Sequence, residues 1–212
     1  SSETENTCIL NLGGIANITW LPASTTAPAT GFDTGPANAL MDAWCLDQTG
    51  LPFDSDGHWA REGSVNEELL EDMLSDAYFS KAPPKSTGKE RFNLDWVKTL
   101  VGRHPEIPTE DIQRTLLQLT VNSVVNQLPE TKDVRIYVCG GGARNPLLME
   151  ELGKALPEAS LSLTSELGVD PQMVEPVAFA WLAKQAFEGK PGNLPDVTGA
   201  AGPRILGAIY PA

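Results

Sequence analysis

The sequence predicts an α/β fold in which helices flank a mixed sheet. This prediction rests on a hairpin pattern near the start of the chain, on a buried strand that runs into three consecutive glycines, and on alternating strands and helices after them. The chain has 212 residues, which is enough to bury one substantial core. We therefore expect a single α/β domain over residues 1–212.

The chain opens with a predicted β-hairpin. The runs Cys8 to Leu12 and Ile15 to Leu21 are rich in β-forming residues, and Gly13-Gly14 between them is typical of a tight turn. A loop from Pro22 to Thr30, rich in Ala, Thr and Pro, follows the second run. This hairpin supplies the antiparallel part of the expected mixed sheet.

A glycine-rich segment precedes the first predicted helix. Residues 31–35 read Gly-Phe-Asp-Thr-Gly, which is too rich in glycine for a core strand. Pro36 suits the first turn of a helix, and Leu40 and Trp44 follow it at helical spacing. We therefore expect Asp33 to lie on the loop that precedes the first turn of a helix.

Capping residues predict three helices in the middle of the chain. Asn66 precedes EELLEDML, Asn93 precedes LDWVKTL with Gly102 closing that helix, and Thr109 precedes the long run DIQRTLLQLTVNSVVNQL. The segment PPKSTGKERFN lies between the first two helices and is polar and rich in helix breakers. It is predicted to be a surface loop.

The second half of the chain alternates strands and helices. Asp133 to Cys139 indicates a buried strand that runs directly into Gly140-Gly141-Gly142. The remaining predicted elements are a helix starting at Pro146 and capped by Asn145, a strand from Leu161 to Thr164, and a helix from about Pro176 to Phe187 ended by Gly189.

Charge and cysteine content exclude several classes of protein. The formal net charge of −13 leaves little basic surface, so we expect no nucleic acid and no anionic membrane as partner. Cys8, Cys45 and Cys139 are far apart and form no CxxC pair, which indicates reduced core thiols in a cytoplasmic protein and no metal site. No apolar run reaches about 20 residues, and the SSETENT start lacks the pattern of a signal peptide.

Two glycine-rich turns follow predicted strands, at Gly13-Gly14 and at Gly140-Gly141-Gly142. Backbone N–H groups in such turns can approach a phosphate because no Cβ stands in the way. Neither turn continues into a Walker A motif, and neither matches the GxGxxG dinucleotide pattern. Taken alone, the first is equally compatible with a plain hairpin turn, and the second with a close strand-to-helix crossing.

Two carboxylates stand in positions that suit chemistry. Asp33, between two glycines, suits a general base, although a capping aspartate is the more common outcome for such a composition. Glu175 precedes Pro176 at the start of an apolar helix, where a glutamate usually complements the helix dipole. The residues alone leave both interpretations open.

Six ordered segments resemble the anhydro-N-acetylmuramic acid kinase family at similar spacing: NLGGIANITWLP, GFDTGPANALMDAW, PPKSTGKERFN, CGGGARNPLLMEEL, VEPVAFAWLA and GNLPDVTGA with the following GPRILGAIYP. Members of that family have a two-domain actin-like ATPase fold, built from ribonuclease H-like lobes, and bind ATP in the cleft between them. They cleave the 1,6-anhydro ring of the sugar while phosphorylating O6, which gives N-acetylmuramic acid 6-phosphate and ADP. The resemblance implies a peptidoglycan-recycling kinase that uses ATP and Mg²⁺.

The resemblance also implies roles for individual residues. Asp33 corresponds to the base that activates the water attacking the anomeric carbon, and Glu175 is similar to a substrate-orienting group. Gly13 and Gly14 look like the second phosphate loop. The adenosine-side loop of the family is matched by Gly140, Gly141, Gly142 and Asn145.

One departure from the family pattern concerns its first phosphate site. The family begins with a strand and a Gly-Thr-Ser-x-Asp-Gly loop, and no such segment occurs here. We therefore expect this chain to be the carboxy-terminal lobe of a two-lobed kinase, inactive without its amino-terminal lobe. By the same resemblance, Ile205 to Tyr210 matches the family's final strand, which returns to the other lobe.

Alternatives to this interpretation remain open at the level of sequence. A levoglucosan kinase shares the fold and the GFDTGP-type motif but acts on an anhydroglucose. A non-catalytic module that binds nucleotide weakly or serves as an assembly partner is an alternative from another class. The expected small-molecule partner is an anhydro amino sugar, and the sequence leaves a homodimer open.

Overall fold

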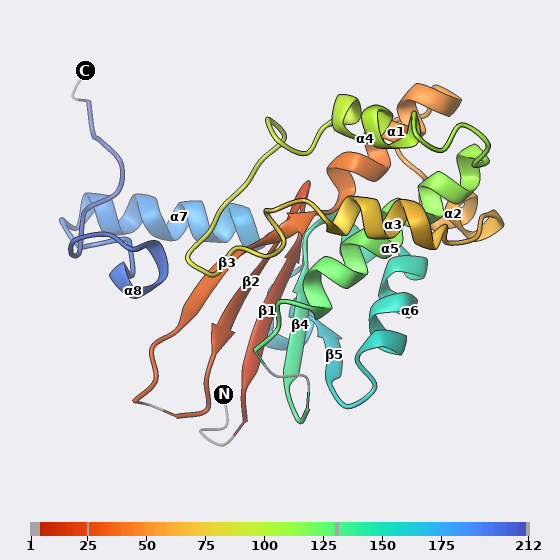
Figure 1. Ribbon diagram of the computed structural model, residues 1–212. Coiled ribbons are helices and arrows are strands. Elements are labelled where there is room, and N and C mark those ends of the chain that lie inside the picture. The colour runs from red at the N-terminus through yellow and green to blue at the C-terminus, as the bar shows by residue number, and fades with distance from the viewer. Residues whose placement is uncertain (1–4, 25, 130–131, 211–212) are drawn as a thin grey trace.

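The computed structural model describes residues 5–24, 26–129 and 132–210, and its centre is a single mixed sheet (Figure 1). The strands are β1 (Thr7–Leu12), β2 (Ile15–Leu21), β3 (Thr30–Pro36), β4 (Arg135–Cys139) and β5 (Ser160–Leu163), in the order β3-β2-β1-β4-β5. The β1–β2 and β2–β3 pairs are antiparallel, whereas β4 runs parallel to β1 and β5 parallel to β4. This is the order of a ribonuclease H-like lobe, so the predicted fold class is confirmed.

A layer of helices covers one face of this sheet (Figure 1). These helices are α1 (Asn38–Thr49), α2 (His58–Glu62), α3 (Glu67–Leu74), α4 (Leu94–Val101), α5 (Thr109–Val125) and α6 (Pro146–Ala155). Short 3₁₀ helices are η1 (Ser55–Gly57), η2 (Gly141–Arg144) and η3 (Thr164–Leu167). The strands bury every second side chain toward this layer, as Leu10 and Ile18 do, and leave the intervening side chains on the other face partly exposed.

Helix α5 is the centre of the core. It packs against β2 and β3 and against α1, α2, α3 and α6. Ten of its 17 residues are buried, among them Leu116, Leu117 and Leu119. Burial of each leucine side chain contributes about 1.5–3 kcal/mol, so this helix binds the sheet and the outer helices into one core.

Capping asparagines located the starts of three helices correctly. The side chains of Asn66, Asn93 and Asn145 accept backbone hydrogen bonds from the third residue of α3, α4 and α6, at 2.9, 3.0 and 3.1 Å. Pro146 is the first residue of α6, and Gly102 ends α4. Each of these assignments was expected because a cap depends only on neighbouring residues.

The prediction of a loop at residues 31–35 is wrong, because these residues belong to strand β3. Ladder bonds to β2 hold them, with a bulge opposite Ala16 and Asn17. Glycine at position 35 reflects close packing, since a Cβ there would lie 2.7 Å from the Phe79 ring and 3.1 Å from Ser123 Cβ. Asp33 therefore lies on a strand.

The helix after this strand also begins later than predicted. Pro36 is the last residue of β3, and α1 starts at Asn38 with Ala37 as its N-cap. A proline is tolerated there because β3 is an edge strand of the sheet. Thr109 was expected to cap the long middle helix, but it is the first residue of α5, and Pro108 is the N-cap. Helix α5 ends at Val125, before the predicted Leu128.

Strand boundaries in the second half differ by one or two residues. Strand β4 starts at Arg135, since Asp133 has a left-handed φ of 53° that a strand does not accept. Strand β5 ends one residue before Thr164, which opens η3. Residues 205–210 pair with no strand in the described structure and are exposed, so their assignment to a strand that returns to the other lobe stays a prediction.

The three cysteines lie in the interior as free thiols, as predicted. Burial raises the pKa of Cys8 to about 12. Burial, with a further contribution from the Glu175 carboxylate, raises the pKa of Cys139 to about 11. The thiols of Cys8 and Cys139 are therefore protonated at neutral pH. Within the described ranges, no helix has the length and apolar character to cross a membrane.

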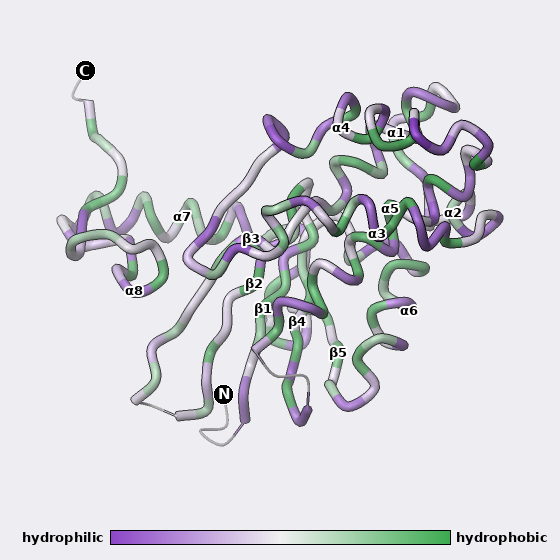
Figure 2. Tube along the Cα trace, in the orientation of Figure 1, coloured by the Kyte–Doolittle hydropathy of each residue, from purple (hydrophilic) through white to green (hydrophobic). Residues whose placement is uncertain are grey.

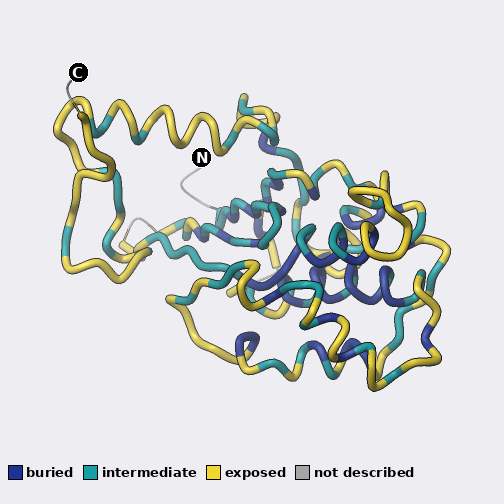
Figure 3. The backbone as a smooth tube through the Cα atoms, turned by 90° about the horizontal axis from the view of Figure 1, so that it is seen from above, coloured by how far each residue is buried: buried dark blue, intermediate teal, exposed yellow. Residues whose placement is uncertain are grey.

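Helix α7 (Val174–Phe187) and the short α8 (Pro195–Thr198) lie apart from the helical layer (Figure 1). No residue of α7 is buried, and seen from above the helix is exposed along most of its length (Figure 3). Its residues are nevertheless strongly apolar (Figure 2), with Phe179 70% and Trp181 50% exposed. That residues 1–212 form one domain stays a prediction.

Candidate functional site

The carboxyl ends of the two central strands meet at one edge of the sheet. Strands β1 and β4 are parallel neighbours, with Asn11 opposite Cys139. A glycine turn follows each strand, at 13–14 and at 140–142. A Cβ at position 142 would lie 2.7 Å from Leu12 Cβ, so glycine allows the second turn to pack on the end of β1. The fold thus brings the two predicted glycine turns together.

The turn at Gly13 and Gly14 is held through its carbonyl groups. The Asn38 N–H donates to Gly13 O at 3.1 Å, and the N–H groups of Ala37 and Ala39 donate to Gly14 O at 3.0 and 3.1 Å. In the described part of the chain, the N–H groups of Gly13 and Gly14 donate no hydrogen bond. The start of α1 therefore fixes the turn and leaves two donors open to a ligand.

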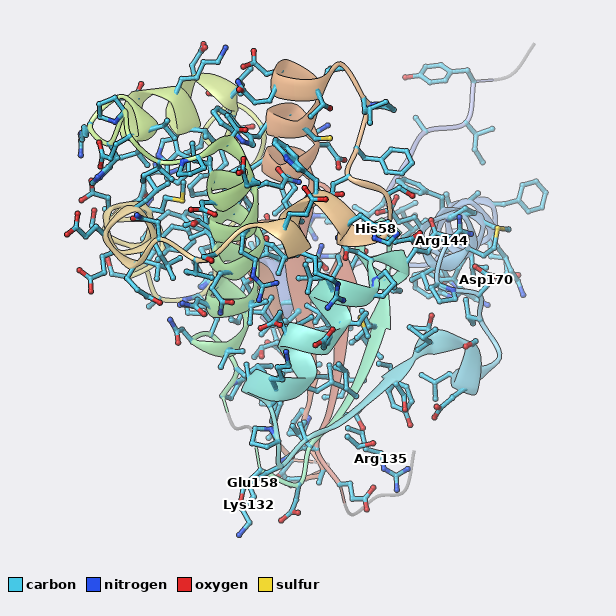
Figure 4. All side chains as sticks on the ribbon, turned by 90° about the vertical axis from the view of Figure 1, so that its right-hand side faces the viewer. His58, Lys132, Arg135, Arg144, Glu158 and Asp170 are labelled. Atoms are coloured by element: carbon cyan, nitrogen blue, oxygen red, sulfur yellow. The ribbon has the colours of Figure 1, made fainter. Side chains whose placement is uncertain are left out.

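The second turn is held by the segment after η3. The Gly140 N–H donates to Pro171 O at 3.0 Å, and Gln172 Nε2 donates to Gly140 O at 2.8 Å. The Gly140 φ of 83° is one that favours glycine. Figure 4 shows Arg144 and Asp170 at this end of the sheet, with Lys132, Arg135 and Glu158 at the opposite end.

A hollow of about 420 Å³ opens beside the second turn. Its lining includes Asn38, Asp42, Gln113, Gly141, Arg144 and Asn145. Gln113 is 1% exposed, and its Oε1 accepts no hydrogen bond. Burial raises the pKa of Asp42 to about 6, against an opposing effect of the Lys89 ammonium. The hollow therefore offers polar groups with unused hydrogen-bonding capacity.

Asp33 is held by three hydrogen bonds from two directions. Its N–H donates to Lys85 O at 3.2 Å, and its carboxylate Oδ2 accepts the Thr87 N–H at 2.9 Å. The hydroxyl of the buried Tyr78 donates to Asp33 O at 2.6 Å. Within the described residues, Oδ1 accepts no hydrogen bond. The carboxylate is thus oriented by one oxygen and open at the other.

A second hollow, of about 520 Å³, lies in front of this carboxylate. It is lined by Asn17, Thr19, Phe32, Asp33, Lys85 and Thr198, among others. The Lys85 ammonium donates to Tyr78 O at 3.2 Å and lies 4.6 Å from the centre of the Tyr78 ring. Lys85 therefore belongs to the scaffold that holds Asp33 and lines the hollow at the same time.

A row of polar side chains crosses the open face of the sheet from Asp33 to Glu175. Asp33 is opposite Asn17, and Asn17 is opposite Asn11, so the three side chains share one face. Asn11 Nδ2 donates to Glu175 Oε1 at 3.4 Å, from the first turn of α7. The two predicted carboxylates therefore lie at the two ends of an asparagine pair.

Sequence reasoning did not single out Asn11, Asn17, Thr87 or Lys89. The asparagines could have been found as polar residues at strand positions on either side of the Gly13-Gly14 turn. The loop residues carried no such signal, because their proximity to Asp33 and to the turn arises only in the folded chain. Asn145 was predicted both as a cap and as a nucleotide contact, and its Oδ1 is engaged as the cap.

Fold and site together define a ribonuclease H-like α/β lobe whose polar residues gather at the carboxyl ends of its central strands. Residues 1–212 match the family model described as "Anhydro-N-acetylmuramic acid kinase". The chain belongs to this kinase family.

Curated relatives named "Anhydro-N-acetylmuramic acid kinase" support the assignment. The relative from Xanthomonas axonopodis pv. citri is 49% identical over 212 residues, which covers 98% of this chain and 55% of that protein. Those from Shewanella pealeana and Nitrosomonas europaea are 49% and 50% identical, with 100% and 96% of this chain and 57% and 56% of the relative covered. This chain thus spans little more than half the length of the relatives it matches.

The solved structure described as "Activator of the 2-Hydroxyisocaproyl-CoA Dehydratase from Clostridium difficile with bound ADPNP" is similar to 82% of this chain. The match covers 57% of that structure, at 15% identity and a TM-score of 0.46. Similarity at this level carries no information about activity.

Proposed function

We propose that the full-length protein is an ATP-dependent kinase that opens the 1,6-anhydro ring of anhydro-N-acetylmuramic acid and phosphorylates O6. The products are N-acetylmuramic acid 6-phosphate and ADP, in a step of peptidoglycan recycling in the cytoplasm. The observation that supports this proposal best is the oriented Asp33 carboxylate at a polar hollow, in a chain of this kinase family.

Asp33 is the general base of the proposed reaction. It takes a proton from a water molecule whose oxygen forms a bond to C1 of the sugar. The C1–O6 bond breaks, and its electron pair stays on O6, which forms a bond to the γ-phosphorus of ATP as ADP leaves. The Thr87 N–H holds Oδ2 of Asp33, so Oδ1 is the oxygen that accepts the proton.

Glu175 and the asparagine row are proposed to orient the sugar. A carboxylate and two amides offer acceptors and donors to hydroxyl and acetamido groups. In this proposal the sugar lies along the row that joins Glu175 to Asp33 through Asn11 and Asn17, with its anomeric carbon toward Asp33. This proposal would account for the presence of two carboxylates at opposite ends of the same row.

ATP is proposed to bind along the two glycine turns. The open N–H groups of Gly13 and Gly14 support contacts to phosphate oxygens, and Gly140 to Gly142 with Asn145 would line the adenosine side. Asn145 Oδ1 caps α6, so its contribution comes from the amide nitrogen. The neighbouring hollow, with unpaired Gln113 Oε1, offers polar contacts to a base.

Mg²⁺ would neutralise charge on the phosphates during transfer. Across the described residues, no group of three His, Cys, Asp or Glu side chains forms a metal site. This fits an ion held mainly by phosphate oxygens and water. Asp42, whose carboxylate accepts no hydrogen bond in the described ranges, would supply the protein oxygen.

The test uses the full-length protein with Mg·ATP in water enriched in ¹⁸O, quenched before the anomeric hydroxyl exchanges. Anhydro-N-acetylmuramic acid and levoglucosan are compared, and residues 1–212 alone serve as the control. We expect the amino sugar to be phosphorylated with at least about tenfold higher kcat/KM, with one ¹⁸O on the sugar and none in the phosphate ester. The control is expected to be inactive, because phosphoryl transfer needs both phosphate sites around ATP.

Other outcomes favour the alternatives. Better turnover of levoglucosan would support a levoglucosan-type kinase. Nucleotide binding by the full-length protein without turnover of either sugar would support a non-catalytic module. Robust phosphorylation by residues 1–212 alone would show that the second lobe is dispensable.

A further inference from the structure

The loop PPKSTGKERFN, predicted only as a surface loop, returns to the site from outside the sheet. Through Lys85 and Thr87 it covers the edge of β3 at Asp33. Two residues further along, Lys89 reaches the turn after β1. A Cβ at position 14 would lie 3.3 Å from Lys89 Cε and 4.0 Å from Lys89 Nζ. Glycine at position 14 therefore leaves room for the lysine side chain to lie across the turn.

The position of Lys89 is set by anchors on both sides. On one side the Thr87 N–H is bound to the Asp33 carboxylate at 2.9 Å. On the other side the Phe92 N–H donates to Gly88 O at 3.1 Å, and Phe92 is fully buried against Tyr78. The backbone of this loop is thus tied to the sheet and to the core, which limits where the lysine side chain can go.

The Lys89 ammonium has unused capacity. In the described part of the chain it makes no hydrogen bond and no ion pair, and its nearest influence is an electrostatic one on Asp42. The neighbouring N–H groups of Gly13 and Gly14 are open as well. A cation and two backbone donors at one turn, in a chain of net charge −13, form a site that suits a multiply charged phosphate.

We propose that Lys89 binds the β- and γ-phosphates of the nucleotide at the Gly13-Gly14 turn. The proposal rests on the proposed function in one respect, namely that the ligand is a nucleoside triphosphate. It assigns the loop two tasks, since Thr87 orients the base and Lys89 holds the phosphate. The two reacting ends of the site are then coupled through three residues of backbone.

The test measures equilibrium binding of ATP, ADP and AMP to the full-length protein by calorimetry, without sugar. For Lys89→Gln we expect ATP affinity to fall about ten- to hundredfold, the worth of one hydrogen bond to a charged group, while AMP affinity stays unchanged. Lys89→Arg should retain ATP affinity within about threefold, because the cation is kept. Lys81→Gln, an exposed charge change in the same region, is the matched control and should leave binding unchanged.

The outcomes separate this inference from the proposed function. Equal ATP affinity in wild type and Lys89→Gln would overturn the role of Lys89 while leaving the kinase proposal intact. An equal loss for AMP and ATP would also overturn it, since the effect would then not lie at the phosphates. Failure of the wild type to bind ATP would overturn both. Lys89 is exposed, and Lys89→Met offers a second neutral variant whose folding is checked by its melting temperature.

Discussion

Asp33 and Glu175 are both carboxylates of the candidate site, but they are held very differently. Asp33 lies on a strand, and three hydrogen bonds hold its backbone and side chain. Glu175 lies on α7, a helix without a buried residue, and accepts one long hydrogen bond of 3.4 Å from Asn11. The contacts that hold Asp33, the proposed base, therefore come from this chain, whereas Glu175 is held by a single long hydrogen bond.

The two longest helices of the described structure differ in the same way, because one is packed in the core and the other is not. Both α5 and α7 are rich in apolar residues, yet α5 has ten buried residues, six of them apolar, and α7 has none. An apolar residue stabilises a fold only when it leaves water, so α7 contributes little to this chain as it stands. We infer that the rest of the full-length protein covers α7 and thereby fixes Glu175.

Hydrogen exchange on residues 1–212 alone would sharpen this comparison most. We expect amides of β1 and α5 to be protected by about 10³ or more, and amides of α7 to exchange within about tenfold of unstructured rates. A 14-residue helix without packing is marginal in water, which is the reason for the expected difference. In the full-length protein α7 should become protected. Equal protection of α5 and α7 in the isolated chain would break the comparison.

Replacing Glu175 by glutamine tests the weakly held side of the site. In the full-length protein we expect the KM for sugar to rise by roughly tenfold, because a neutral amide accepts hydrogen bonds less strongly than a carboxylate. The melting temperature should stay within about 1 °C, since the side chain has one long contact. Asn11→Ala is the matched variant, because it removes the partner and keeps the carboxylate. An unchanged KM in both variants would remove Glu175 from substrate binding.

Asp42→Asn is expected to give the smallest effect, and its sign depends on pH. Burial raises the Asp42 pKa from 3.8 to about 6, so the stability from protonation is present below pH 3.8 and is lost as pH rises through 6. When the pH is raised from 4 to 7.5, the free energy of unfolding of Asp42→Asn should therefore increase relative to that of wild type by up to about 1 kcal/mol, after allowance for solvent screening. Denaturant unfolding at both pH values measures this.

Asp47 offers the control of opposite sign for that experiment. Its hydrogen bond from Lys98 lowers the pKa of the Asp47 carboxyl. Stability from this pair is present above the ordinary carboxyl pKa and is lost as pH falls, so Asp47→Asn should lose stability at pH 7.5 and not at low pH. The same direction of change in both variants would contradict the assigned cause of the Asp42 shift.

Features that depend on neighbouring residues could be predicted from the sequence. The caps Asn66, Asn93 and Asn145 and the β1–β2 hairpin are local, and each was placed correctly. Strand β3 could not be recognised, because its glycines resemble a loop until Phe79 and Ser123 are seen to pack against Gly35. The contrast shows that glycine content alone does not separate a loop from a crowded strand.

The candidate site also contains features that the local sequence predicts and features that arise only in the folded chain. The glycine turns could be located because each follows a β-forming run, and parallel strands bring such turns to one edge. The contacts of Thr87 with Asp33 and of Lys89 with Gly14 join residues that are more than 50 positions apart. No local pattern encodes these contacts, so only the folded chain identifies the loop as part of the site.

The central claim is that Asp33 is a general base already oriented within this chain, and the variant Asp33→Asn tests it most directly. Asparagine keeps the size of the side chain and an oxygen for the Thr87 N–H, but it cannot take up the proton. Measuring kcat and melting temperature together on the full-length variant, we expect kcat to fall by about 10²–10⁴ while the melting temperature barely changes. Near-normal kcat in a well-folded Asp33→Asn protein would contradict the assignment.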